Sequence, residues 1–125
     1  MAHGRRKRHR LATKLGGYVI SGAWEGNSVC GIVGIASTSS VNQQVYDALG
    51  LLQHRGQDST GIATLDGPHV HIRKGKGMVK EAFRTRDMRS LVGNVGLGHV
   101  RYATKGEADN ELEAQPFYEI GRAHV

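Results

Sequence analysis

The sequence is poor in cysteine, proline and aromatic residues, and it has no long hydrophobic run. A single cysteine among 125 residues cannot form an intramolecular disulfide framework. Cys and His do not cluster at the spacing of zinc ligands, so no metal site is predicted. No apolar stretch approaches the roughly 20 residues that a membrane-spanning helix needs. These absences argue against a secreted disulfide scaffold, a zinc module and a membrane protein, and a reducing, cytoplasmic setting is expected.

Positive charge is concentrated at one end of the chain. The formal charge is +6, but residues 1–29 hold six basic side chains and one acid, which leaves the body nearly neutral. The basic run at 5–10 could be a nucleic-acid-binding arm. The body, however, offers no basic surface to extend such a contact, so binding to nucleic acid is not expected. Residues 1–29 also lack helical or strand periodicity, and we expect a basic leader, which is either a propeptide or the result of a mis-called start.

From Cys30 onward the sequence follows an orderly α+β pattern. Apolar residues spaced by three, four and seven positions predict an amphipathic helix over 42–53, and Ser40 with Gln43 forms a capping-box signature before it. Asp66-Gly67-Pro68 separates two β-prone runs and predicts a hairpin. The predicted order is a strand at 31–36, the helix at 42–53, strands at 60–65 and 69–74, one or two short helices within 79–91, and a strand at 94–102.

Cys30 is the first candidate for chemistry because it begins the ordered body. A lone cysteine beside a strand is commonly a small buried apolar residue. If the preceding residues are removed, however, Cys30 gains a free α-amine, whose pKa of about 7.7–8.0 suits it to accept the thiol proton. Nucleophile and base would then belong to one residue. With a peptide bond on its nitrogen, Cys30 lacks that base.

Two arginines are the next candidates. Arg55 and Arg101 each lie in a polar stretch bordered by glycine, near the end of a predicted element. An arginine there could hold a substrate carboxylate through two parallel hydrogen bonds, or it could simply be solvated. His54 and His99 are interpreted as structural, because no carboxylate partner is identifiable for either.

Four motifs then carry a resemblance. They are CGIVGI at 30–35, LQHRGQDS at 52–59, GHVRYAT at 98–104 and EAQPFY at 113–118. In this order and spacing they closely resemble the start of the amidophosphoribosyltransferase family, whose N-terminal part is a class II glutamine amidotransferase domain. QHRGQDS and EAQPFY favour this family over other class II amidotransferases, such as those of the glucosamine-6-phosphate synthase or asparagine synthetase type, which stay open as alternatives. The resemblance covers residues 30–118.

The resemblance implies a fold and a division of roles. The fold would be a four-layer αββα N-terminal-nucleophile hydrolase fold, incomplete in this chain. Cys30 would attack the side-chain amide of glutamine, Arg101 would bind the substrate α-carboxylate with Thr104 close by, and Arg55 would support the site. In full-length relatives the ammonia passes to a phosphoribosyltransferase domain that uses phosphoribosyl pyrophosphate and Mg²⁺. A homo-oligomer is expected for the full-length enzyme, and no cofactor is expected in this 125-residue chain.

The ends of the chain bear on activity. Residues 119–125 do not follow the resemblance and are expected to be a non-native tail. The sequence also stops before the Asn-Gly pair that supplies the oxyanion donors in this family, and loss of one such donor typically costs about 10²–10³ in rate. We therefore expect this 125-residue chain to be a fragment without appreciable glutaminase activity.

Overall fold

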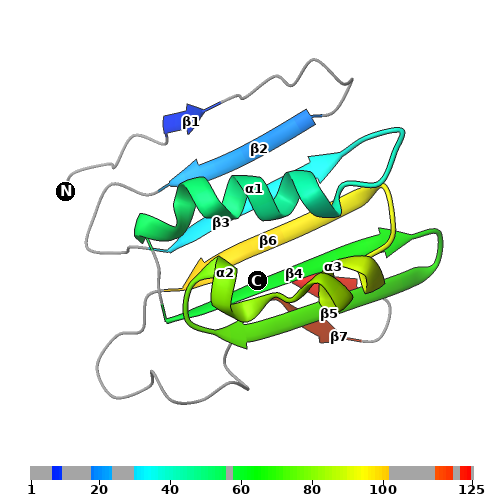
Figure 1. The fold of residues 1–125 in the computed structure, drawn as a ribbon. Coiled ribbons are helices and arrows are strands. Elements are labelled where there is room, and N and C mark those ends of the chain that lie inside the picture. Colours follow the sequence, from blue (N-terminus) through cyan, green and yellow to red (C-terminus); the bar gives the residue numbers. More distant parts are fainter. Residues whose placement is uncertain are drawn as a thin grey trace.

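A six-stranded antiparallel sheet forms the body of the molecule, in the strand order β1-β2-β3-β6-β4-β5 (Figure 1). The computed structural model describes residues 7–9, 18–23, 30–55, 58–101, 115–119 and 122–124. The strands of the sheet are β1 (Lys7–His9), β2 (Tyr18–Ala23), β3 (Gly31–Ala36), β4 (Ser59–Asp66), β5 (His69–Lys76) and β6 (Val95–Arg101). The helices are α1 (Asn42–Leu52), η1 (Gln53–Arg55), α2 (Val79–Ala82) and α3 (Thr85–Ser90). The expected α+β class is confirmed.

Helix α1 lies across β3 and β6, and α2 and α3 lie on the same side of the sheet (Figure 1). Alternate residues of β3, including Val33 and Ile35, are buried beneath α1, which contributes Val45 and Leu49. Strand β6 has glycine at 96 and 98, and this lets the helix approach closely. The core therefore lies between α1 and one face of the sheet, as the period of the predicted helix requires.

The predicted hairpin is confirmed, whereas the predicted cap of α1 is wrong. Strands β4 and β5 pair in register across a turn in which Gly67 has φ of 55°. The N-cap of α1 is Val41, which is fully buried and makes no side-chain cap. Its N–H donates to the carbonyl of Gly93 (3.0 Å), so a tertiary contact fixes the start of the helix. The Ser40 hydroxyl bonds instead to Asn42 Oδ1 (3.4 Å).

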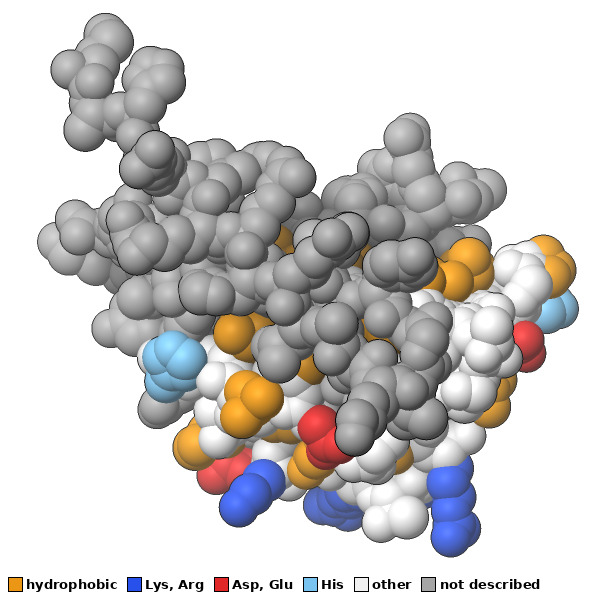
Figure 2. Space-filling model, turned by 90° about the horizontal axis from the view of Figure 1, so that it is seen from above, with side chains coloured by type: hydrophobic (Ala, Val, Ile, Leu, Met, Phe, Trp, Pro, Cys, Tyr) orange, Lys and Arg blue, Asp and Glu red, His pale blue; other side chains and the backbone are white. Residues whose placement is uncertain are grey.

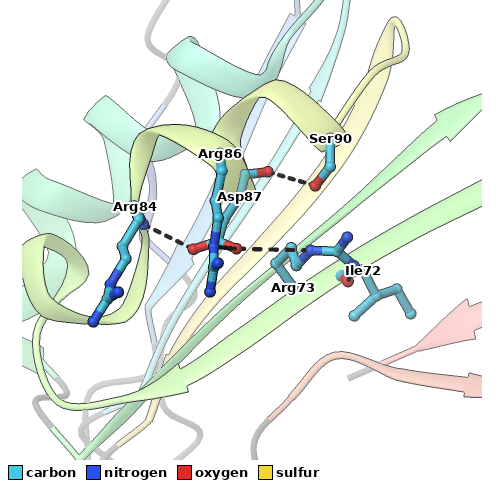
Figure 3. Close-up of polar contacts among 6 residues, drawn as sticks. All are labelled: Ile72, Arg73, Arg84, Arg86, Asp87 and Ser90. Atoms are coloured by element: carbon cyan, nitrogen blue, oxygen red, sulfur yellow. Dashed lines mark hydrogen bonds and ion pairs between the residues drawn. The ribbon is translucent and has the colours of Figure 1, made fainter.

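The 79–91 region forms two helices, and an acidic residue bonds back to the start of each. Glu81 Oε2 accepts from the N–H of Met78, and Asp87 Oδ2 accepts from the N–H of Arg84, both at 2.9 Å. Asp87 also lies 3.9 Å from the Nε of Arg73 on β5, so α3 is held to the edge of the sheet (Figure 3). These bonds occupy backbone donors that a helix start leaves free.

Two segments in which the sequence predicted no strand contain strands. Within residues 1–29, β1 and β2 extend the sheet, because β2 pairs with the outer edge of β3. Near the other end, β7 (Phe117–Glu119) pairs with β8 (Arg122–His124) in a separate two-stranded sheet. The basic run at 5–10 and the glycines of residues 1–29 hide this strand pairing from a periodicity analysis. The predicted domain boundaries at 29/30 and 118/119 stay predictions.

The longest described helix, α1, has 11 residues, and none of the described helices is long and apolar enough to cross a bilayer. On the described surface seen in Figure 2, basic side chains are interspersed with acidic and apolar ones.

Candidate functional site

Cys30 and Arg101 meet at one end of the sheet. Cys30 directly precedes β3, and Arg101 is the last residue of β6. Because Gly31 pairs with Val100 in the antiparallel register, Cys30 lies beside Arg101 on the neighbouring strand. Both side chains are half-buried, and the Cys30 thiol is free. Two of the predicted site residues, far apart in the sequence, are thus brought together.

Both of these side chains lie on the face of the sheet opposite α1. Side chains alternate along a strand, and a Cβ built at Gly31 would meet Leu52 of α1, so position 31 faces the helix. Positions 30 and 101 therefore face the other way. We call this second face the site face, and Ser59, Gly61 and His99 lie on it as well, because Ser59 pairs with Arg101 and Gly61 with His99.

The loop after α1 is attached to the same end of the sheet. Helix η1 contacts β6, and the N–H of Asp58 donates to the carbonyl of Arg101 (3.1 Å). The carbonyl of Asp58 in turn accepts from the N–H of Gly77 (2.9 Å). The backbone of Arg55, the last residue of η1, is therefore close to this end, while the position of its side chain lies outside the described structure. Thr104 also lies outside the described residues.

Two buried polar atoms on the site face have no described hydrogen-bond partner. They are Oγ of Ser59 and Nδ1 of His99, whose residues are only 6% and 3% exposed. Burial, together with the positive charge of Arg101, lowers the pKa of His99 to about 4, so its ring is neutral at physiological pH. Buried polar groups without partners are rare in folded proteins, and here they lie next to Cys30 and Arg101. His54, by contrast, is exposed and its ring bonds to the carbonyl of Leu51 (3.0 Å).

A short segment from near the end of the chain also lies on the site face. A Cβ built at Gly61 would overlap the carbonyl oxygen of Gln115 and come within 2.7 Å of Pro116 Cδ. Pro116 is fully buried. The ammonium of Lys74 lies 5.0 Å from the centre of the Phe117 ring. Neither this contact nor the burial of Ser59 was predicted, although a glycine inside a strand can signal a close backbone approach.

The arrangement suits covalent chemistry on a small substrate that carries a carboxylate group. A half-buried thiol can serve as a nucleophile, and a guanidinium on the adjacent strand can bind a carboxylate in a bidentate manner. Among the described residues, no group of three or more His, Cys, Asp or Glu side chains could hold a metal ion.

No protein-family profile matches this chain, but it resembles known amidophosphoribosyltransferases in sequence. The amidophosphoribosyltransferase of Pseudomonas aeruginosa is 53% identical over 90 residues, and that of Escherichia coli is 54% identical over 91 residues. Each of these alignments covers 72% of this chain and 18% of the relative. A relative of the same name from Methanothermobacter thermautotrophicus is 48% identical over 92 residues.

The chain also resembles solved structures of related proteins. One, described as the allosteric regulatory enzyme of purine biosynthesis, superposes with a TM-score of 0.64 at 36% identity. The glutamine phosphoribosylpyrophosphate amidotransferase of B. subtilis, solved with ADP and GMP, superposes with a TM-score of 0.59 at 35% identity. Each covers 69% of this chain, which spans 18% of theirs. The expected resemblance is confirmed: over about ninety residues this chain is a homologue of the N-terminal part of amidophosphoribosyltransferases, and it spans about 18% of their length.

Proposed function

We propose that this chain contributes the glutamine-hydrolysing site of an amidophosphoribosyltransferase. The observation that carries the proposal is the placement of Cys30 beside Arg101 on one face of the sheet, at the ends of adjacent strands. The names of the relatives favour this activity over the glucosamine-6-phosphate synthase and asparagine synthetase types.

The reaction begins with a proton transfer within one residue. Once Cys30 is the first residue of the mature chain, its α-amine takes the thiol proton, and the thiolate attacks the side-chain carbonyl carbon of glutamine. The C–N bond breaks, the α-ammonium group returns the proton to the leaving nitrogen, and ammonia departs from a γ-glutamyl thioester. Water then attacks the thioester, glutamate is released, and the sulfur is protonated again.

Substrate binding falls to the residues around Cys30. Arg101 binds the α-carboxylate of glutamine through paired hydrogen bonds. Thr104, three residues further along the chain, completes that pocket, and Arg55 supports the loop next to the nucleophile. The neutral ring of His99 adds no second positive charge to the site.

Ammonia then reacts elsewhere in the full-length enzyme. It displaces pyrophosphate from phosphoribosyl pyrophosphate and gives phosphoribosylamine, the product that enters purine synthesis. Mg²⁺ would assist that step in a phosphoribosyltransferase part that this chain does not span. The sheet described here would be one inner layer of an αββα sandwich, with a second sheet covering the site face. We place the full-length enzyme in the cytoplasm as a homo-oligomer.

The test uses the full-length protein with Cys30 as its first residue, and it measures glutamate released from glutamine. We expect Cys30→Ala to lose hydrolysis at least about a thousandfold, because no other described group replaces the nucleophile. Arg101→Lys keeps the charge but loses the paired geometry, and its KM for glutamine should rise about tenfold or more. A form that retains residues before Cys30 should lose hydrolysis while its thiol can still be alkylated. Unchanged hydrolysis in Cys30→Ala would contradict the proposal.

A further inference from the structure

Residues 115–117 pack against two neighbouring strands of the sheet, β4 and β5. Gly61 of β4 pairs with Lys74 of β5, and both residues lie on the site face. Gly61 accepts the Gln115 backbone against the sheet, because the space that a Cβ would fill is occupied by the Gln115 carbonyl and the Pro116 ring. The Lys74 ammonium lies over the Phe117 ring at 5.0 Å, a favourable cation–π arrangement. We call Gly61 and Lys74 the seat.

The register shows how close the seat is to the candidate site. Arg101 and Ser59 form one cross-strand pair, with Cys30 beside Arg101 on the other side. The next pair on the site face is His99 with Gly61. Two residues along a strand span about 7 Å. The Gln115 backbone, which packs on Gly61, therefore lies about 7 Å along the strand from the Arg101–Ser59 pair. This distance is comparable to the length of one amino-acid substrate.

A buried polar atom belongs to each of these two cross-strand pairs. Ser59 Oγ belongs to the pair at the end of the sheet, and His99 Nδ1 belongs to the pair that includes Gly61. Neither atom has a hydrogen-bond partner among the described residues, although both are buried. Buried polar atoms without partners are rare in folded proteins, and these two lie within one cross-strand pair of Gly61.

We propose that Gly61 is a positioning residue for glutamine binding: its missing side chain lets Gln115–Phe117 lie against the sheet and form one wall of the glutamine-binding site proposed at Cys30 and Arg101. The inference rests on the proposed glutaminase function. Gly61 does not touch the reacting atoms, and it acts through residues 115–117, which pack on it. A methyl group at position 61 would push this wall away from the sheet, and the substrate would be held less well.

The test is Gly61→Ala in the full-length protein with Cys30 as its first residue. We expect the KM for glutamine to rise about tenfold or more, because a displacement of about 1 Å in a pocket wall costs positioning. The rate of phosphoribosylamine formation from added ammonium salt should change less than about twofold, because free ammonia does not need the glutamine pocket. This second readout also shows that the variant is folded.

The matched control is Gly34→Ala, on the site face of β3, where, among the described residues, a new Cβ would meet only the Gly96 carbonyl oxygen at 4.0 Å. Its KM for glutamine should stay within about twofold of the wild-type value. If Gly61→Ala does not fold, Phe117→Ala is tested instead. It removes the contact between the Phe117 ring and Lys74, and it should raise the KM for glutamine about threefold. An unchanged KM in a folded Gly61→Ala protein, or in Phe117→Ala where the former does not fold, overturns the inference. Absence of glutamine hydrolysis in the wild-type protein would instead overturn the proposed function.

Discussion

At the scale of single residues, the fold acts directly on the ionisation of His99. The ring is almost fully buried on the site face, and the neighbouring Arg101 adds a positive charge that opposes protonation. Together they lower the pKa from the ordinary 6.5 to about 4. The ring thus stays neutral across the pH range in which a histidine on the surface would gain a proton.

This neutrality predicts a specific loss of stability in acid. Between pH 6.5 and about 4 the unfolded chain binds a proton at His99 that the folded chain rejects, so the free energy of unfolding falls as the pH falls. The total loss is about 3 kcal/mol, and it ends below pH 4, where both states are protonated. Urea unfolding of the wild-type protein and of His99→Gln at several pH values measures this loss.

His99→Gln should flatten the pH dependence of the free energy of unfolding between pH 6.5 and about 4, whatever it does to stability at pH 7. His69→Gln is the matched control, because His69 is an exposed histidine at the start of β5. An equal slope in wild type and His99→Gln would show that His99 is protonated in the folded protein.

At the scale of elements, the contact between α1 and β6 depends on two glycines. A Cβ at Gly98 would lie 2.8 Å from Val45 and 2.9 Å from Leu49, and one at Gly96 would lie 2.8 Å from Val45. Because these helix residues are fully buried, a new Cβ on β6 would have to displace side chains of the core. The helix therefore packs directly on the backbone of β6.

Gly98→Ala should destabilise the protein by about 1–3 kcal/mol, because it overpacks this contact. Gly50→Ala is the matched control, since a Cβ at Gly50 on α1 meets none of the described residues within 4 Å. That change should stabilise the protein by about 0.5–1 kcal/mol through the loss of backbone freedom in the unfolded chain. Denaturant unfolding of both variants measures the difference. Adding Val45→Ala to Gly98→Ala should recover part of the loss, and strict additivity of the two changes would argue against the contact.

The elements differ in how far the sequence alone could define them. The strand from Gly31 and the hairpin at Gly67 were predictable because glycine, β-prone runs and turn residues act locally. The start of α1 was not, because the burial of Val41 and its bond to Gly93 involve residues distant in sequence. For the same reason Cys30 and Arg101 could be selected by motif, but their shared face required the register of β3 and β6.

At the scale of the whole molecule, the sheet has one face covered by helices and one that carries the candidate site. On the site face, Leu65 pairs with Val95, and these residues are 39% and 41% exposed. Paired apolar side chains on a sheet face commonly pack against a second layer. The proposed αββα sandwich supplies such a layer in the full-length protein, and this gives the layering a direct test.

Leu65→Lys in the full-length protein should lower stability by about 2 kcal/mol or more if a second sheet covers the site face, because a charge would then be buried without a partner. Leu51→Lys is the matched control, because Leu51 on α1 is 70% exposed and its replacement should change stability by less than about 0.5 kcal/mol. The measurement is the thermal midpoint of glutaminase inactivation for the two variants and the wild type. Equal midpoints for Leu65→Lys and Leu51→Lys would mean that this part of the site face stays open to solvent, and the four-layer arrangement would then be wrong for this protein. A drop confined to Leu65→Lys would place the covering layer over the end of the sheet away from Cys30, so that the pocket lies between two sheets.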